Sequence, residues 1–311
     1  MDTKNASRRP RHLYIDITDI HTLRHRYRYR YTYTQIHRHS LTDIHTKRHR
    51  IDMKGKTILI TGAGSGIGAA CAMKFAAGGC RLILNGRNAE KLEATGNAAR
   101  ERHGAEVLLL PFDVRDRKAI ADALRLLPEE WKEIDVLVNN AGLALGMDKE
   151  SEGSLDDWET VIDTNVKGTL AMTRLIVPGM IRRGHGHVIN IGSIAGDAAY
   201  PGGSVYCASK AAVKTLSDGL RIDLADTPVR VTCIKPGQVE TNFSMVRFHG
   251  DRERADNVYK GYRPLAAEDI AGTVWFAASA PEHVQIAEML VLPTCQATAT
   301  VIHKQDLKTG E

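Results

Sequence analysis

The sequence predicts an α/β protein in which a doubly wound parallel sheet is covered by helices on both faces. Three observations support this prediction. Short apolar runs rich in Ile, Leu and Val alternate with longer stretches of helix-forming residues. The first of these runs leads directly into a glycine-rich turn and then into a helical segment. Residues 53–311 also have the length of one such domain.

The predicted elements follow one another in a regular order. The predicted strands are residues 56–60, 81–85, 106–110, 134–139, 187–191, 229–234 and 288–292. Helices are predicted at residues 69–77, 88–102, 116–127, 155–183 and 204–225. Pro178 is expected to bend or break the fourth helix. Because this alternation implies right-handed crossovers between parallel strands, ligands are expected at the carboxyl ends of the strands.

The glycine turn at residues 61–68 reads Thr-Gly-Ala-Gly-Ser-Gly-Ile-Gly. It joins a strand to a helix, so that free backbone N–H groups and the positive end of the helix dipole favour a phosphate there. Glycine lets the backbone approach that phosphate closely, although an ordinary glycine-rich turn is the alternative. With its flanking elements, the turn predicts the first unit of a dinucleotide-binding Rossmann fold. The expected cofactor contacts are Gly62, Gly64, Ser65, Gly66, Ile67 and Gly68.

The end of the second strand bears on which dinucleotide binds. An acidic residue there would accept hydrogen bonds from a free ribose 2′-hydroxyl and repel a 2′-phosphate. The sequence instead reads Asn85-Gly86-Arg87. Because a guanidinium pairs with phosphate through two charge-assisted hydrogen bonds, Arg87 favours NADP over NAD. The alternative is an arginine that faces solvent at the start of a helix.

Two further strand ends are expected to face the cofactor. Asp113 and Val114 follow the third strand and are placed to reach adenine, although Asp113 is also suited to cap the next helix. Asn140, Ala141 and Gly142 end the fourth strand with small residues, where a flat ring or a ribose has to pass. A simple turn is the alternative for this stretch.

A reacting set is predicted after the fifth strand. Ser193 lies just beyond that strand, and Tyr206 and Lys210 are four residues apart on the following helix, which places them on one face. A free tyrosine has a pKa of about 10, and a nearby ammonium favours the phenolate. Ser193 is suited to hold the oxygen of a substrate. The alternative is that all three are ordinary surface residues.

These motifs resemble the short-chain dehydrogenase/reductase family over residues 54–295. The resemblance rests on the glycine turn, on residues 139–142, on the Ser193, Tyr206 and Lys210 set, and on Asn165 and Pro236-Gly237. It implies that Tyr206 is the acid/base, that Lys210 binds ribose and lowers the pKa of the phenol, and that Ser193 orients the substrate.

The same resemblance assigns further residues. It implies that Asn165 positions a water molecule next to Lys210. It also implies that the nicotinamide is held by Pro236, Gly237, Val239 and Thr241. Helices 155–183 and 204–225 are the expected subunit contacts of a homotetramer.

A narrower similarity is to the NADP-dependent 3-hydroxy acid dehydrogenases. It rests on residues 127–131, 141–146, 157–158, 172–174 and 246–250. These enzymes oxidise the β-hydroxyl of L-serine, L-allo-threonine and related short acids. The alternatives are a broad carbonyl or 3-oxoacyl reductase and, from another class, an NADP-binding regulator or a nucleic-acid-binding protein. The complete set of Ser193, Asn165, Tyr206 and Lys210 favours an enzyme.

A substrate carboxylate needs a hydrogen-bond donor near Ser193 and Tyr206. Arg247 lies in the segment after the Pro236-Gly237 turn, where this family usually places a loop that covers the substrate. We therefore expect Arg247, or backbone N–H groups of residues 142–146, to receive the carboxylate. The alternative is that Arg247 packs on the surface or pairs with Asp251.

Residues 1–52 form a basic arm unlike the rest of the chain. They hold 12 Lys and Arg against 5 Asp and Glu, whereas residues 53–311 hold 30 against 32. Residues 18–26 return almost unchanged as residues 42–50. A nucleic-acid-binding tail, a presequence and a mis-assigned start with Met53 as the true first residue are the alternatives, and the third is favoured. The predicted division is therefore arm 1–52, domain 53–295 and tail 296–311.

Composition limits the compartment and the cofactors. No apolar run is long enough to span a bilayer. The five cysteines are odd in number and lack metal-type spacing, which indicates reduced thiols in the cytoplasm. No metal site is predicted, since His185 and His187 flank a turn and the start of a strand. The expected partner is a small-molecule substrate.

Overall fold

The computed structural model describes residues 50–305. Most of the predicted arm and the last residues of the predicted tail lie outside this range. Within it, seven strands form one parallel sheet in the order β3-β2-β1-β4-β5-β6-β7. The strands are β1 Thr57–Ile60, β2 Arg81–Gly86, β3 Val107–Pro111, β4 Val136–Asn139, β5 Gly186–Ile191, β6 Val229–Pro236 and β7 Glu288–Val291. The predicted doubly wound parallel sheet is confirmed.

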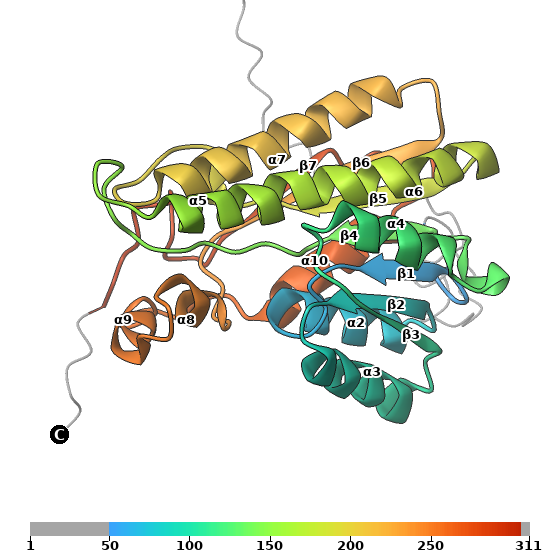
Figure 1. Ribbon diagram of the computed structural model, residues 1–311, viewed down its shortest axis with the longest axis horizontal. Helices are drawn as coiled ribbons and strands as arrows, with labels where there is room; N and C mark the ends of the chain where they lie inside the picture. The colour runs from blue at the N-terminus through green and yellow to red at the C-terminus, as the bar shows by residue number, and fades with distance from the viewer. Residues whose placement is uncertain (1–49, 306–311) are drawn as a thin grey trace, which may run out of the picture. The chain divides into compact units, whose positions relative to one another are not determined.

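Helices cover both faces of this sheet (Figure 1). One layer contains α2 Gly66–Ala77, α3 Ala89–His103 and α10 Ala267–Ala278. The other contains α4 Arg117–Arg125, α5 Leu155–Ile162, α6 Thr169–Arg183 and α7 Ser204–Asp223. Short pieces complete the chain: η3 Glu129–Trp131, the π-helical η4 Asp163–Gly168, η5 Ile194–Gly196, α8 Phe243–Arg247 and α9 Arg252–Asn257.

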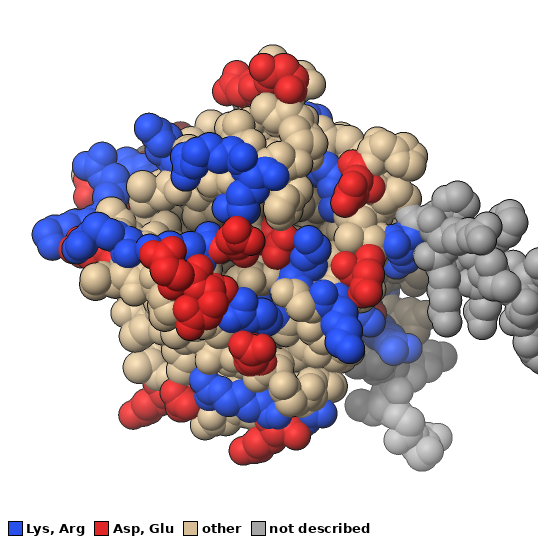
Figure 2. Space-filling view, turned by 90° about the vertical axis from the view of Figure 1, so that its right-hand side faces the viewer, with Lys and Arg blue, Asp and Glu red and all other residues tan. Residues whose placement is uncertain are grey.

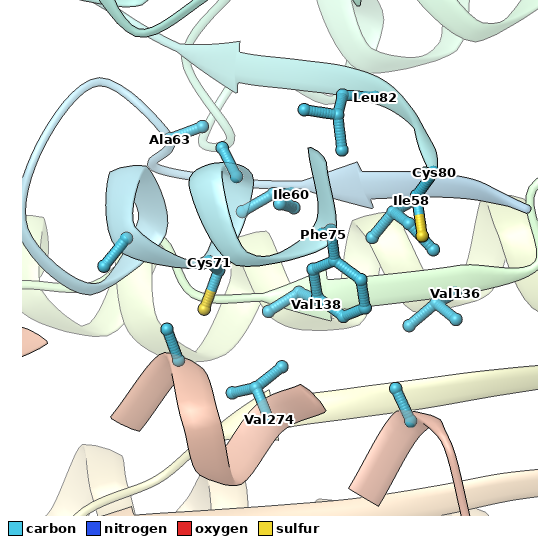
Figure 3. Packing of buried hydrophobic residues seen from close by; sticks show 14 of the residues in the cluster. Ile58, Ile60, Ala63, Cys71, Phe75, Cys80, Leu82, Val136, Val138 and Val274 are labelled. Atoms are coloured by element: carbon cyan, nitrogen blue, oxygen red, sulfur yellow. The ribbon is translucent and has the colours of Figure 1, made fainter. Parts of the chain in front are cut away.

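The strands are apolar on both faces because side chains alternate along an extended chain. Ile58 and Ile60 of β1 point to the α2 side, where Phe75 of α2 and Val274 of α10 lie among them (Figure 3). Leu59 between them points to the opposite face and packs in a second cluster with residues of α6. The two clusters therefore stabilise the sheet from both faces. The carboxyl ends of its strands lie outside these clusters and are available to form a site.

The strand order places that site. The chain runs from β1 outward to β3, and then returns to the centre to add β4 beside β1 and continue to β7. The connections after β1 and β4 thus leave the sheet in opposite directions and open a crevice between them. The glycine turn follows β1, and Asn140 follows β4, so two predicted cofactor segments meet at this switch point.

The helices differ from the sequence prediction in two ways. The chain does not break at Pro178, because α6 continues through it while its neighbours Ile176 and Met180 are buried against the sheet, and the alternative of a bend there stays a prediction. This packing outweighs the loss of one backbone hydrogen bond. The departure from α-helical geometry lies upstream, in the π-helical η4. In addition, no helix is predicted between the sixth and seventh strands, where the structure has α10.

Short terminal segments pack against the domain. The backbone N–H of Ile51 donates to Ser279 O at 2.9 Å, and the Arg50 guanidinium lies 4.9 Å from the centre of the Phe276 ring. At the other end, Gln296 is buried and its side chain accepts from the N–H of Gln238 at 2.9 Å. Residues on both sides of the predicted domain 53–295 therefore contribute contacts to it.

Two surface properties bear on the predicted partners. In the described part of the chain, no helix is long and apolar enough to cross a membrane. On the face of the domain seen in Figure 2, lysines and arginines are interspersed with aspartates and glutamates. That face therefore presents no continuous basic strip of the kind that follows a nucleic-acid backbone.

Candidate functional site

A cavity of about 420 Å³ lies at the switch point of the sheet. Its lining includes most of the side chains and turns predicted from the sequence. They are Gly62, Gly64, Ser65, Gly66, Ile67, Arg87, Asp113, Val114, Asn140, Ala141, Gly142, Ser193, Tyr206, Lys210, Pro236, Gly237, Val239, Thr241 and Arg247. Of the predicted site residues, Gly68 and Asn165 do not line it. One concave site thus collects residues from segments spread over the chain.

The glycine turn forms one wall of the cavity. Gly62 and Gly66 have φ values of 64° and 53°, a conformation that favours glycine. Ser65 is the N-cap residue of α2, but its side chain makes no capping hydrogen bond. The backbone N–H groups of the first turn therefore find no acceptor on this side chain and are left to donate to another group. A Cβ on Gly68 would overlap Gly62 O, so Gly68 serves the packing of α2 against the turn.

The end of β4 braces this turn. The Asn140 side chain donates to Thr61 O at 2.9 Å and to Gly62 O at 3.2 Å. The Thr61 hydroxyl in turn accepts from the backbone N–H groups of Asn140 and Ala141 at 3.0 and 2.9 Å. The two segments that flank the switch point are therefore one hydrogen-bonded unit, which fixes the floor of the cavity.

Two cations lie at the end of the cavity beside β2. Arg87 follows β2, and its guanidinium is 3.9 Å from the Asp113 carboxylate and more than half exposed. Lys91 of α3 also lines the cavity, and a Cβ on Gly64 would lie 3.2 Å from Lys91 Cβ. Lys91 is absent from the sequence prediction. The sequence feature that could have indicated Lys91 is its position in the first turn of a helix. The helix dipole disfavours a cation there unless an anion binds nearby.

Asp113 is engaged by a neighbour that the sequence prediction does not include. Its carboxylate accepts from Arg115 Nε at 3.0 Å and from Arg115 Nη2 at 2.7 Å. Burial acts to raise the pKa of Asp113, but the hydrogen bonds from Arg115 bring this pKa below its usual value. The cap of α4 is Asp116, not Asp113. Asp113 is therefore an ionised residue in the wall next to Val114.

Asn165 lies beneath the cavity floor. Its side chain accepts from Leu143 N at 2.8 Å and donates to Leu143 O at 2.8 Å and Ser209 Oγ at 3.0 Å. A Cβ on Gly142 would lie 3.2 Å from Asn165 Oδ1 and 3.3 Å from Lys210 Nζ. Asn165 therefore holds the segment after β4 against α7, directly beside Lys210.

The structure brings Ser193, Tyr206 and Lys210 together at the centre of the cavity. Ser193 lies between β5 and η5 with extended backbone, and its Oγ accepts from Ala195 N at 3.1 Å. Lys210 Nζ lies 5.9 Å from the centre of the Tyr206 ring and donates to Ile191 O at 2.8 Å. Phe243 of α8 packs edge-on against the Tyr206 ring at 5.5 Å between centroids.

Burial dominates the electrostatics of this trio. It raises the pKa of the Tyr206 phenol, while a hydrogen bond from Ser193 and the charge of Arg247 act to lower it. Burial also lowers the pKa of Lys210 to about 8. Burial thus keeps the Tyr206 phenol protonated and makes the Lys210 ammonium costly. A charged ligand that enters the site therefore changes the protonation of both groups.

A turn after β6 closes one side of the cavity. Pro236 ends β6, and a Cβ on Gly237 would overlap the side chain of Gln296. Thr241 lies beside the glycine turn, 3.4 Å from the place of a Cβ on Gly66. Val239 pairs with Leu265 in an isolated bridge that anchors the segment leading to α8.

Arg247 lines the cavity beside Tyr200 and Tyr206. Its Nε donates to Gly146 O at 3.2 Å, and its Nη1 donates to the Tyr200 hydroxyl at 2.9 Å. Its Nη2 is buried and has no hydrogen-bond partner. Within residues 50–305, this is the only cationic nitrogen that is buried without a partner in a residue lining the cavity. Arg247 does not pair with Asp251, which caps α9 instead.

Several lining residues are absent from the sequence prediction. Besides Lys91, they include Asn85, Asn88, Thr164, Ile194, Tyr200, Gln238, Tyr259, Gln296 and Ala299. Most of them come from loops, and no local pattern in the sequence marks them. Only the path of the folded chain brings them to the cavity.

With this fold and this site, the chain belongs to the short chain dehydrogenase family, whose sequence model matches residues 56–252. The NADP-dependent 3-hydroxy acid dehydrogenase of Schizosaccharomyces pombe is 45% identical over 254 residues, which cover 81% of this chain and 98% of that protein. The NADP-dependent 3-hydroxy acid dehydrogenase YdfG of Salmonella typhi is 47% identical over 243 residues, covering 78% and 96%.

Solved structures agree with these relatives. The closed form of serine dehydrogenase complexed with NADP+ matches 80% of this chain and 100% of its own length, with a TM-score of 0.75 and 45% sequence identity. The structure of serine dehydrogenase from Escherichia coli matches with a TM-score of 0.67 and 41% identity, covering 78% and 99%. The predicted family resemblance is confirmed.

Proposed function

We propose that the protein is an NADP-dependent oxidoreductase that acts on the β-hydroxyl of short 3-hydroxy acids such as L-serine, L-allo-threonine and 3-hydroxypropanoate. One observation carries the proposal. A single cavity is lined by the glycine turn, by the set of Ser193, Tyr206 and Lys210, and by Arg247, whose guanidinium has a buried nitrogen without a partner. The names of the relatives and the NADP+ of the solved serine dehydrogenase support it.

The cavity fits NADP. Gly62 and Gly66 have positive φ values, and Cβ atoms on Gly62, Gly64 and Gly66 would meet Ala141, Lys91 and Thr241, so the glycines let this turn lie close to its neighbours at the start of α2, where a pyrophosphate is expected. Arg87 and Lys91 provide positive charge for a 2′-phosphate, and no acidic residue stands at position 86 to repel it. When bound, NADP supplies the hydride acceptor for the carbon that carries the hydroxyl.

Ser193 and Tyr206 bind the substrate oxygen and transfer its proton. Ser193 Oγ accepts from Ala195 N, and its hydroxyl rotates about a single bond, so the proton that bonds to Tyr206 is able to turn to the reacting oxygen. Tyr206 takes the proton from the β-hydroxyl during oxidation and returns it during reduction. Because burial opposes the phenolate, Tyr206 depends on the positive charge gathered around it, from Lys210, Arg247 and the oxidised nicotinamide.

Arg247 gives the site its preference for acids. Its unpartnered Nη2 is a buried cation at the substrate end of the cavity, and a carboxylate satisfies it with a charge-assisted hydrogen bond. The guanidinium carbon is 5.9 Å from the centre of the Tyr206 ring. A carboxylate separated from the reacting carbon by one methylene group, as in a 3-hydroxy acid, is compatible with this short distance.

The remaining predictions belong to the same proposal. A homotetramer built on α5, α6 and α7 is expected from the family resemblance, and exposed apolar side chains on these helices, such as Leu155, Leu170 and Ile222, support an interface there. A cytoplasmic location stays the expectation from the cysteine pattern, and the five free cysteines of the structure are compatible with it.

The direct test is initial-rate kinetics followed through the absorbance of the reduced cofactor. We expect L-serine, L-allo-threonine and 3-hydroxypropanoate to be oxidised with NADP, and NAD to be used much less efficiently. Turnover of simple alcohols or ketones with no turnover of the acids would contradict the proposal and favour a broad carbonyl reductase. Binding of NADP without turnover of either class would favour a regulator.

A further inference from the structure

Tyr200 occupies a place in the cavity for which the sequence gives no signal. It lies between η5 and α7, it is half-buried, and it lines the cavity beside Arg247. The ring rests against Gly203, where any Cβ would overlap it. Glycine at position 203 therefore provides the space for this ring, and the aromatic side chain is held at the substrate end of the site.

Arg247 and Tyr200 support each other. The guanidinium carbon lies 5.4 Å from the centre of the Tyr200 ring, and Nη1 donates to the Tyr200 hydroxyl at 2.9 Å. The backbone of Arg247 is also tied across the cavity, because its carbonyl accepts from Gly146 N at 2.9 Å. With Nε bonded to Gly146 O and Nη1 to the Tyr200 hydroxyl, the guanidinium is fixed at two nitrogens, and Nη2 is the nitrogen that has no partner.

The hydroxyl of Tyr200 has a proton to give. A tyrosine hydroxyl donates one hydrogen bond, and this oxygen already accepts one from Arg247. Burial raises the pKa of Tyr200 above its usual value, so the hydroxyl keeps its proton at neutral pH. The nearby thiol of Cys207 is a weak acceptor and competes poorly with a carboxylate.

We propose that Tyr200 and Arg247 together form a two-donor carboxylate clamp, in which Nη2 of Arg247 and the Tyr200 hydroxyl each donate to the substrate's carboxylate. This inference rests on the proposed function and makes Tyr200 a determinant of acid specificity. It adds a direct donor to the single cation expected from the sequence. An acid enters the clamp with both donors satisfied, whereas a neutral analogue leaves a buried N–H and a buried O–H unpaired.

The test compares an acid with its neutral twin. Tyr200→Phe is expected to raise KM for 3-hydroxypropanoate about 10- to 100-fold, the loss typical of a hydrogen bond to a charged group. Its kcat should change little, and kinetics with the methyl ester should stay near those of wild type. The matched control is Tyr262→Phe, whose hydroxyl donates to Val258 O and which does not line the cavity.

A double-mutant cycle separates donation from positioning. If Tyr200 donates directly, Tyr200→Phe still raises KM for the acid in an Arg247→Met background. If it acts only by holding Arg247, the substitution has no further effect there, and the two-donor clamp is wrong. Acid preference that is lost in Arg247→Met but kept in Tyr200→Phe would also overturn the role of Tyr200 while leaving the proposed function intact. A wild-type enzyme without preference for the acid over the ester would overturn both.

Discussion

The two ends of the cavity are built in different ways. The cofactor end is built around one continuous turn at residues 61–68, braced by Asn140 after β4, with Arg87 and Lys91 beside β2. The substrate end is assembled from three distant segments, in which Tyr200, Arg247 and Gly146 bond to one another. The first end is encoded locally and the second only by the folded path of the chain.

This difference has a physical consequence. The glycine turn is determined by backbone conformation, since Gly62 and Gly66 adopt positive φ values that few other residues tolerate. The substrate end is determined by side-chain hydrogen bonds between loops, each of which is replaceable by another donor. We therefore infer that substitutions in this site alter substrate choice more readily than they alter cofactor binding.

The largest expected effect lies between the two ends. Tyr206→Phe removes the acid/base oxygen and leaves both the glycine turn and the clamp intact. We expect turnover to fall by roughly 10²–10⁴-fold, the range typical of general acid–base catalysis, while NADP binding measured by calorimetry is retained. Near-normal turnover in Tyr206→Phe would exclude the proposed chemistry.

At the cofactor end, charge should decide between NADP and NAD. Gly86→Asp with Arg87→Ser is expected to weaken NADP binding at least tenfold, because a charge-assisted hydrogen bond to the 2′-phosphate is lost. A Cβ at position 86 would lie 3.3 Å from Cδ1 of Leu92, which is fully buried and would have to shift slightly to accept it. Lys91→Gln should weaken NADP binding in the same direction. KM for NAD serves as the internal control, and an equal loss for both cofactors would mean that these substitutions disturb the fold.

We expect the buried ammonium of Lys210, which the proposed function requires, to lower the free energy of unfolding at neutral pH. Its pKa falls from 10.5 to about 8 on burial, so below about pH 8 the folded protein carries the full cost of a buried ammonium. That cost is relieved between pH 8 and 10.5, where the unfolded chain binds the additional proton. Without cofactor, Lys210→Met should therefore be more stable than wild type at pH 7, on the order of 1–3 kcal/mol, and this advantage should shrink as pH rises to 10.

Thermal unfolding at several pH values measures this difference. Lys214→Met, one turn further along α7, is the matched control, because Lys214 pairs with Asp218 in a partly exposed position. It should show no stabilisation at pH 7. A Lys210→Met protein that is less stable than wild type at pH 7 would mean that the hydrogen bond to Ile191 O outweighs the cost of burial.

The smallest effect is expected from the basic arm. Deletion of residues 1–49 should leave kinetics and melting temperature unchanged, because the composition of this segment provides little apolar surface for a core. Deletion of residues 1–52 removes the contacts of Arg50 and Ile51 with Ser279 and Phe276, and should cost on the order of 1 kcal/mol. Activity or salt-sensitive nucleic-acid binding that is lost with residues 1–49 would restore a role for the arm.

The comparison also explains which features were predictable from the sequence. The strands, the glycine turn and the Tyr206 and Lys210 pair are local patterns, with periods of two or four residues, and the structure contains all of them. Tyr200 and Lys91 were not predictable in the same way, because one lies in an irregular loop and the other resembles any lysine on a helix. Pro178 shows a different limit, because the local signal for a helix break is overridden by burial of the surrounding helix.

The central claim is that a buried cation at the substrate end selects 3-hydroxy acids. It is tested most directly by the ratio of kcat/KM for 3-hydroxypropanoate to that for its methyl ester, measured with NADP in wild type, Arg247→Lys and Arg247→Met. The account predicts a large ratio in wild type, a smaller one in Arg247→Lys and the smallest in Arg247→Met, where Tyr200 is the remaining donor, with the ester rate nearly constant. A ratio in Arg247→Met equal to that of wild type would contradict it.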